Sequence, residues 1–331
     1  MERSERARGC LVGVAVGDAL GFPLEGLSAR RVRRRFGALQ DYRFLGSTGF
    51  VSDDTEQTVM LGESIVTAAG DPKRSAGLFG SRLVGWFWTI PPGVGLATVR
   101  ASLKLTVGLA GGVTSAGNGA AMRAAPLGLW PAPRRPLVEA VSRVTHTDPR
   151  GVDAARCLAE GVAALLDDEF PDLDCLRARV PDLDPRLEGA LAQAWECVAQ
   201  GLSAEETARK VGTGGYVLHS LPLAFTALWR KPATFLEGLH GVILQGGDTD
   251  STGAMAGALL GTWLGRGAIP ENLAAHLEPC FSATRLEKLA EALLQGHFGA
   301  DYRRAHPLAL RWREVQIKLG VGVHVLGRLV P

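Results

Sequence analysis

In the segment 246–258, GGDTDSTGAMAGA, two carboxylates lie two residues apart and are followed directly by two hydroxyls. The glycines predict a turn, and the small residues that follow predict a closely packed helix whose first turn carries Asp248, Asp250 and Ser251. Hard oxygen ligands gathered at a helix start suit Mg²⁺ or Mn²⁺ better than zinc. The alternative is an acidic helix cap, because carboxylates near a helix N-terminus also benefit from the macrodipole.

A second acidic cluster, Ser52-Asp53-Asp54, stands just before an apolar helical pattern that continues to Val66. Ser52 is a good N-cap candidate, and acids in the first turn match the helix dipole. Capping needs only one acid, however, and two adjacent carboxylates repel one another unless a cation sits between them. The surplus charge therefore favours a ligand role over capping alone.

The two clusters would converge if their helices ran side by side. Four carboxylates can be held together only by offsetting positive charge, which two divalent cations would supply. A two-metal site of this kind orients substrate hydroxyls and activates water. Spacing alone does not separate this arrangement from two unrelated capped helices.

The element before the first cluster is a predicted helix over 3–20. Its glycines recur at every fourth position, Gly9, Gly13 and Gly17. Each costs about 1 kcal/mol of helix stability against alanine, so we expect another helix to approach closely there. Asp18, amid small apolar residues, should be paired or should cap another element. Glu25 follows a proline turn and is either a positioned carboxylate or an exposed loop acid.

The small-residue loop 111–123, GGVTSAGNGAAMR, could present several backbone N–H groups to an anion such as phosphate. It matches neither the Walker pattern nor a dinucleotide fingerprint, and a plain flexible turn would look similar. His146 lies at a break in the predicted helical region 136–166. It could be a ligand contact, a cap or a satisfied surface histidine, and the residue alone favours the last.

Composition narrows the class of protein. A net charge of +2 and a pI near 8.3 exclude bulk polyanion binding. The arginine run at 30–35 circles its predicted helix, which favours a solvated helix over a phosphate-binding stripe. Five widely spaced cysteines without a C-x-x-C pair indicate buried thiols in a reducing compartment. No signal-peptide pattern is present, and the apolar stretch 254–264 is too short to span a bilayer, so we expect a cytoplasmic protein.

No segment shows the alternating pattern of a strand, and we find no internal repeat or long linker. We therefore expect one all-α domain of more than ten helices over residues 1–331. Besides those above, the expected helices are two within 70–110, a short one ending before Pro126, then 174–179, 186–201, 203–211, 215–229 and 232–244, with amphipathic helical segments over 271–330.

Taken together and in order, these segments resemble the ADP-ribosylglycohydrolase family. The resemblance covers most of the chain and rests on Gly17-Asp18-Ala19-Leu20-Gly21 with Glu25, Ser52-Asp53-Asp54-Thr55, Gly117-Asn118-Gly119 through Met122-Arg123, Thr145-His146, Gly215-Tyr216-Val217 and Gly246-Gly247-Asp248-Thr249-Asp250. It implies an orthogonal all-α fold with a binuclear Mg²⁺ or Mn²⁺ centre at the base of a cleft.

The resemblance also implies roles for individual residues. The metal ligands would be Ser52, Asp53, Asp54, Asp248, Asp250 and Ser251. The ADP-ribose would be held by Ser115, Gly117, Asn118 and Gly119, with His146 nearby. The catalytic carboxylates would be Glu25, Asp53 and Asp250. The chain departs from the family at Ser52 and Ser251, where threonine is usual, and at Ala116, where some relatives have an aromatic residue. The first change should preserve metal binding, and the second leaves the pocket shape open.

The implied reaction is hydrolysis of an N- or O-glycosidic bond at the distal ribose, which releases ADP-ribose from a modified protein side chain. A carboxylate would accept the proton of the attacking water. Two alternatives stay open: a hydrolase of the same fold acting on a small-molecule or nucleic-acid conjugate of ADP-ribose, and a non-catalytic ADP-ribose-binding protein. The presence of all four aspartates and Glu25 argues against the second.

Overall fold

The computed structural model describes residues 1–37, 39–109 and 112–329. These residues form seventeen α-helices and no β-strand, as the sequence predicts. The helices are α1 (Arg3–Gly21), α2 (Ala29–Phe36), α3 (Asp53–Thr67), α4 (Pro72–Phe87), α5 (Leu96–Thr106), α6 (Ala125–Leu129), α7 (Arg135–Ser142), α8 (Pro149–Leu166), α9 (Leu173–Arg179), α10 (Pro185–Ala199), α11 (Ala204–Val211), α12 (Val217–Trp229), α13 (Phe235–Ile243), α14 (Thr249–Leu264), α15 (Glu271–Ala274), α16 (Ala283–Gln295) and α17 (Pro307–Leu329).

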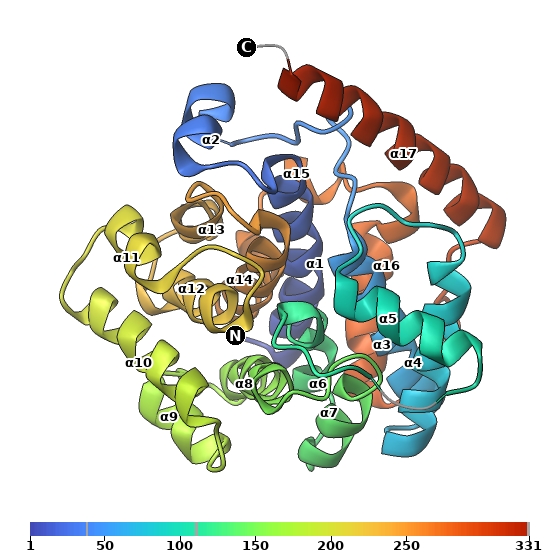
Figure 1. The fold of residues 1–331 in the computed structure, drawn as a ribbon. Coiled ribbons are helices and arrows are strands. Elements are labelled where there is room, and N and C mark those ends of the chain that lie inside the picture. The colour runs from blue at the N-terminus through green and yellow to red at the C-terminus, as the bar shows by residue number, and fades with distance from the viewer. Residues whose placement is uncertain (38, 110–111, 330–331) are drawn as a thin grey trace.

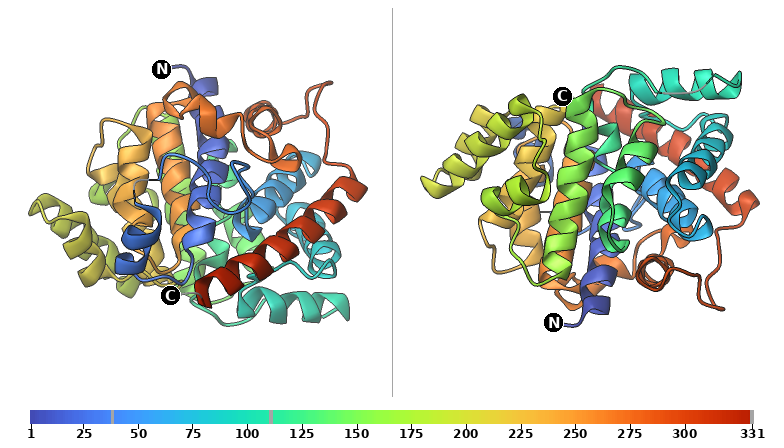
Figure 2. Two further views of the ribbon diagram at one scale, coloured as in Figure 1. Left: turned by 90° about the horizontal axis from the view of Figure 1, so that it is seen from above. Right: turned by 90° about the horizontal axis from the view of Figure 1, so that it is seen from below.

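Helices α1 and α14 lie side by side at the centre, and the other helices pack around this pair (Figures 1 and 2). Glycines on the two helices face each other along the whole contact. A Cβ atom added at Gly13 would lie 2.1 Å from the carbonyl oxygen of Gly257, and one added at Gly257 would lie 2.0 Å from that of Gly13. The close helix approach expected from the glycine spacing is therefore confirmed.

Helix α1 is also long and apolar enough to cross a membrane by length and composition. The segment Arg3–Leu24 has a mean hydropathy of 1.3, but 94% of its most apolar window is buried against other parts of the described chain. A core helix has these same properties, and the central position of α1 explains them.

One cluster of contacting buried apolar side chains runs from Ala7 to Tyr302. The single domain over residues 1–331 stays a prediction, which this continuity favours. Helix α17 lies on the outside (Figure 2) and is anchored by the buried Arg313, which donates hydrogen bonds to Glu278 at 2.7 Å and to the carbonyl oxygen of Val51.

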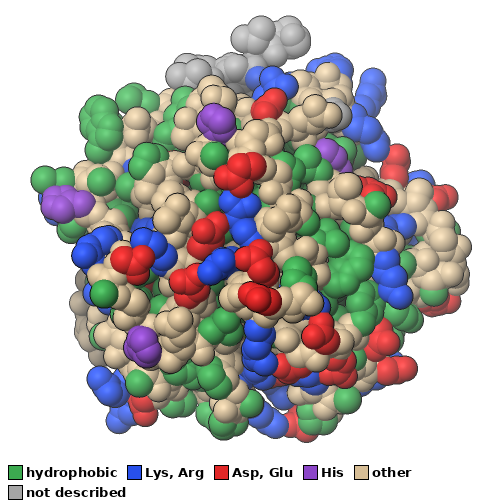
Figure 3. All heavy atoms as spheres, turned by 180° about the vertical axis from the view of Figure 1, so that it is seen from behind, with side chains coloured by type: hydrophobic (Ala, Val, Ile, Leu, Met, Phe, Trp, Pro, Cys, Tyr) green, Lys and Arg blue, Asp and Glu red, His purple; other side chains and the backbone are tan. Residues whose placement is uncertain are grey.

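The expected solvated arginine helix is confirmed, because all five arginines of α2 are exposed and only Val32 is buried. On the face shown in Figure 3, acidic and basic side chains are interspersed. All five cysteines are buried and have free thiols, also as expected.

Several helix ends differ from their predictions by one to three residues, and one boundary differs in kind. A short helix was expected to stop before Pro126, but α6 begins at Ala125 and contains Pro126 in its first turn. Proline is favoured in that position because its fixed φ suits a helix start and its missing N–H would have had no intrahelical partner. The glycine loop before α6, described from Gly112 onward, instead forms a single 3₁₀ turn at Asn118–Ala120.

Candidate metal and substrate site

A cavity of about 510 Å³ lies over the N-terminal ends of α3 and α14. Seven separate stretches of the chain contribute to its wall, which explains why no single motif describes it. The lining comprises the turn at Glu25 and Gly26, the first residues of α3, the segment 93–98, the loop 115–122, His146, the turn 214–215 and the segment 247–251.

The structure brings the two acidic clusters together at the bottom of this cavity. The hydroxyl of Ser251 donates to Asp54 Oδ2 at 3.2 Å, and the hydroxyl of Ser52 donates to the same oxygen at 3.0 Å. Ser52 also caps α3, since its Oγ accepts from the Asp54 N–H at 3.2 Å. Of the six predicted ligands, only Ser52 does not line the cavity.

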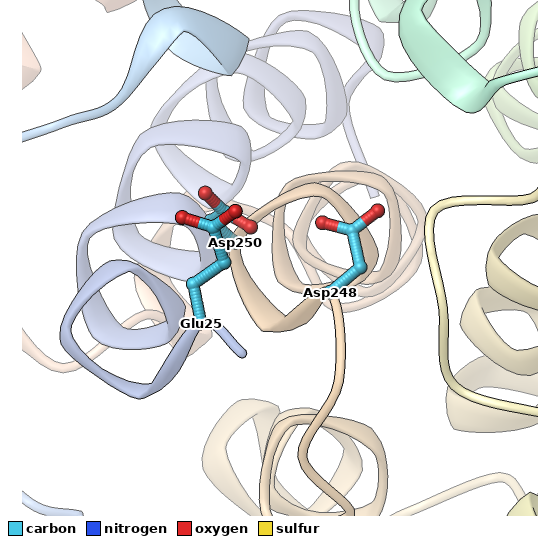
Figure 4. Close-up of side chains that lie close together, drawn as sticks. All are labelled: Glu25, Asp248 and Asp250. Atoms are coloured by element: carbon cyan, nitrogen blue, oxygen red, sulfur yellow. The ribbon is translucent and has the colours of Figure 1, made fainter. Parts of the chain in front are cut away.

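Three further carboxylates meet beside Asp54. Glu25, Asp248 and Asp250 each offer one oxygen, and these oxygens lie within 4.8 Å of one another (Figure 4). Glu25 follows the 3₁₀ turn Phe22–Leu24, Asp248 immediately precedes α14, and Asp250 lies in its first turn. Glu25 is therefore a positioned carboxylate, and the alternative of an exposed loop acid is wrong.

The carboxylates of this cluster are all negative when ionised and therefore repel one another. Burial raises the pKa of Asp53 to about 8, and the charges of Asp18, Glu25 and Asp248 add to the effect. Burial likewise raises the pKa of Asp250 well above its ordinary value, with Glu25, Asp248 and Asp54 contributing. A divalent cation would reverse these shifts by offsetting the negative charge.

The donor set fits such a cation. All the side chains that face one another are hard oxygen ligands of the kind preferred by Mg²⁺ and Mn²⁺. Asp54 Oδ1 is buried and has no hydrogen-bond partner among the described residues. A buried carboxylate oxygen without a donor is costly, and metal coordination would satisfy it.

We expect the metal-free protein to lose stability as the pH rises from about 5 to about 8. The pKa of the Asp53 carboxyl is near 4 in the unfolded chain and about 8 in the folded protein. Between about pH 4 and about pH 8 the folded protein therefore binds more protons than the unfolded chain. The stabilising contribution is therefore complete at low pH and disappears as the pH rises. Urea denaturation with chelator at several pH values measures it. Added Mn²⁺ should reduce the fall, and stability that rose with pH would contradict this account of the site.

Asp18 fixes the start of α3. Its carboxylate accepts hydrogen bonds from the N–H of Ser52 at 3.0 Å, the N–H of Thr55 at 3.0 Å and the hydroxyl of Thr55 at 2.5 Å. This confirms the expectation that Asp18 caps another element. Because α1 is held against α14 by the glycine contact, Asp18 also places α3 relative to Asp250.

The glycine loop forms another part of the cavity wall and contacts the acidic cluster. Ser115 Oγ accepts from the Gly117 N–H at 3.2 Å, and the Asn118 N–H donates to the carbonyl oxygen of Gly215 at 3.1 Å. The Asn118 amide donates to Asp248 Oδ2 at 2.6 Å and thus ties the loop to the acidic cluster. Ser115, Gly117, Asn118 and Gly119 all line the cavity. Their contact with ADP-ribose stays a prediction.

His146 is buried and lines the same cavity. The interpretation as a surface histidine, favoured by the residue alone, is therefore wrong. Burial, together with the charge of Arg123, lowers the pKa of His146 to about 3, so the imidazole is neutral near pH 7. A Cβ atom added at Gly119 would lie 2.7 Å from His146 Cε1, which explains glycine at that position.

Some lining residues carry no sequence signal. Leu96 and Thr98 come from the first turn of α5, where nothing but ordinary helical residues is seen. Gly214 reaches the cavity only because the turn before α12 folds against the glycine loop. These contributions depend on the packing of distant segments and could not be found from spacing.

The fold and the site define an all-α protein with a carboxylate-rich cavity at the N-terminal ends of α3 and α14. The family model described as ADP-ribosylglycohydrolase matches residues 1–302. The chain therefore belongs to the ADP-ribosylglycohydrolase family and is a hydrolase, which confirms the resemblance noted in the sequence.

The chain is similar to several proteins over most of its length, and some of their names are of the same class. An uncharacterized protein of Archaeoglobus fulgidus is 36% identical over 88% of this chain and 97% of its own length. The ADP-ribosyl-[dinitrogen reductase] glycohydrolase of Rhodospirillum rubrum is 29% identical over 83% of this chain and 90% of its own length. A solved structure titled ADP-ribosylglycohydrolase-related protein complex has 29% identity and a TM-score of 0.70, and covers 89% of this chain and 99% of its own.

The name of a further relative states which residue is modified in its substrate. The ADP-ribosylarginine hydrolase Tri1 of Pseudomonas putida is 27% identical over 87% of this chain and 78% of its own length.

Proposed function

We propose that this protein hydrolyses the glycosidic bond between ADP-ribose and a modified protein side chain, in a reaction that depends on two divalent cations. The observation that carries the proposal is the meeting of Glu25, Asp248 and Asp250 within 4.8 Å under a cavity of about 510 Å³. A pocket of this size is in the range that encloses a nucleotide-sized ligand.

The ligands of the cations would be Ser52, Asp53, Asp54, Asp248, Asp250 and Ser251. When bound, Mg²⁺ or Mn²⁺ would supply positive charge that orients ribose hydroxyls and makes water more acidic. The ligand oxygens at the starts of α3 and α14 are held in place by hydrogen bonds. Asp18 fixes the start of α3, and the Asn118 amide fixes Asp248.

A carboxylate of the cluster would take up the proton of the attacking water. Glu25, Asp53 and Asp250 are the candidates, since each lines the cavity. Negative charge beside the anomeric carbon also stabilises an oxocarbenium-like transition state. The neutral imidazole of His146 does not oppose this, because it adds no positive charge near the sugar.

Named relatives act on ADP-ribosylated dinitrogen reductase and on ADP-ribosylarginine. These names support a modified protein as substrate, with arginine the first linkage to examine. Small conjugates and modified nucleic acid are the competing substrates. The five free thiols also favour a reducing, cytoplasmic location.

The test is release of free ADP-ribose from a panel of arginine-, serine- and nucleic-acid-linked substrates, each with Mg²⁺, with Mn²⁺ and with chelator. Metal-dependent release from one protein linkage is the expected result. Release only from small or nucleic-acid conjugates would replace the proposed substrate class. Tight binding of ADP-ribose without release from any substrate would instead identify a non-catalytic binding protein.

A further inference from the structure

The site has two halves: the acidic cluster, and the wall formed by the glycine loop and His146. The side chain of Arg123 lies between them, and it is not among the residues that line the cavity. It is 1% exposed, and its guanidinium stacks 4.9 Å above the ring of Phe79. Burial lowers its pKa to about 9 and the charge of Asp53 raises it, so the group is cationic at neutral pH. A fully buried guanidinium must use its donors well, because an unsatisfied one is costly.

One branch of the guanidinium leads to the predicted metal ligands. Arg123 Nη1 donates to Gln57 Oε1 at 3.1 Å, and Gln57 Nε2 donates to Asp53 Oδ2 at 2.7 Å. Gln57 is fully buried one turn after Asp53 in α3. A donor that holds the amide oxygen also fixes the direction of the amide NH₂, and thus the orientation of the Asp53 carboxylate.

The other branch leads to the wall that holds the glycine loop. Arg123 Nη2 donates to Thr145 Oγ1 at 2.5 Å, and Thr145 Oγ1 lies 2.8 Å from His146 Nδ1. A Thr hydroxyl that already accepts from the guanidinium has its own proton free for Nδ1. The other ring nitrogen, Nε2, lies 3.7 Å from a Cβ atom added at Gly117, on the side of the loop.

We propose that Arg123 is a positioning residue that orients both halves of the site at once. It holds Gln57 so that the amide NH₂ donates to Asp53, and it holds Thr145 so that the hydroxyl donates to His146 Nδ1. His146 is then the Nε2–H tautomer and presents an N–H donor to an oxygen of the bound ligand. The planar fork of arginine reaches both partners, which the single ammonium of lysine cannot do.

The inference about ligand binding rests on the proposed function, but its test does not require activity. We would record the ¹⁵N NMR signals of the His146 ring in the full chain, assigned with His146→Gln, and measure Mn²⁺ binding by calorimetry. Arg123→Lys should convert His146 from the Nε2–H tautomer to a mixture and weaken Mn²⁺ binding by roughly 10-fold or more, the usual effect of losing a residue behind a ligand.

Two variants separate the branches. Thr145→Val should change the tautomer and leave Mn²⁺ affinity as in the wild type, whereas Gln57→Leu should weaken Mn²⁺ binding and leave the tautomer unchanged. Arg82→Lys is the control, because Arg82 is a partly buried arginine that donates to Met60 and Ser64 outside this network. It should change neither measurement.

The proposal is overturned if folded Arg123→Lys keeps both the wild-type tautomer and the wild-type Mn²⁺ affinity. If that variant does not fold, Thr145→Val and Gln57→Leu decide the question, and failure of either to show its own effect contradicts the corresponding branch. A wild-type protein that binds no Mn²⁺ would overturn the proposed function and the Asp53 branch, whereas the His146 tautomer would still test the other branch.

Discussion

Replacement of Asp250 by asparagine should lower ADP-ribose release by roughly 100- to 1,000-fold, as expected when one preorganised charged group of an active site is lost. The change keeps the shape of the side chain and removes its charge. Asp250 is buried among Glu25, Asp248 and Asp54, so the neutral amide should relieve repulsion in the metal-free protein. The variant should therefore be less active and, without metal near pH 8, more stable than the wild type.

A fall in activity together with a rise in the stability of the metal-free protein is expected if Asp250 is a metal ligand. Steady-state release with Mn²⁺ and urea denaturation with chelator measure the two quantities. Asp174→Asn is the control, because the side chain of Asp174 is 90% exposed and pairs only with Arg177 among the partners found. Full activity in Asp250→Asn would remove Asp250 from the metal site. Loss of stability at pH 8 without metal would show that the carboxylate is structural.

Replacement of Gly257 by alanine should lower the free energy of unfolding by about 3 kcal/mol or more, at the upper end of overpacking effects. The added Cβ atom would lie 2.0 Å from the carbonyl oxygen of Gly13, and backbone atoms cannot rotate away as side chains can. Helices α1 and α14 would have to separate. Because α1 carries Asp18 and α14 carries Asp250, the site should be lost together with stability.

Gly189→Ala is the matched control for this change. Gly189 also lies inside a helix, α10, but nothing lies within 4 Å of a Cβ atom added there. That substitution should be neutral or stabilise by up to about 1 kcal/mol, because alanine is the better helix former. Equilibrium denaturation of the two variants compares them directly. Equal stability of the two variants would mean that the close glycine contact is not needed.

Much of the local structure follows from the sequence. Ser52 caps α3 as expected, since capping depends only on residues within one turn. The recurrence of Gly9, Gly13 and Gly17 predicts a close helix neighbour, because glycine is costly in a helix without one. The helix start after Gly247 and the surplus acids near it are likewise visible as types and spacing. The family resemblance, which rests on such motifs in order, also indicated the all-α fold.

The position of each motif in space needed the tertiary structure. The glycine spacing predicts that another helix packs closely against α1, but it does not indicate that this helix is α14. The burial of His146 and the contact of Ser251 with Asp54 arise only when distant segments pack together.

The link from Asp53 through Gln57, Arg123 and Thr145 to His146 has the same origin. Asp53, Arg123, Thr145 and His146 stand in motifs that the sequence shows, but nothing in those motifs indicates that these residues contact one another. The link exists because α3 and the turn before α8 enclose one guanidinium. Sequence by itself thus determined the helices, their caps and the acidic clusters, which depend on neighbours within a few residues. Only the tertiary structure decided which side chains share the cavity, because those contacts join residues far apart in the chain.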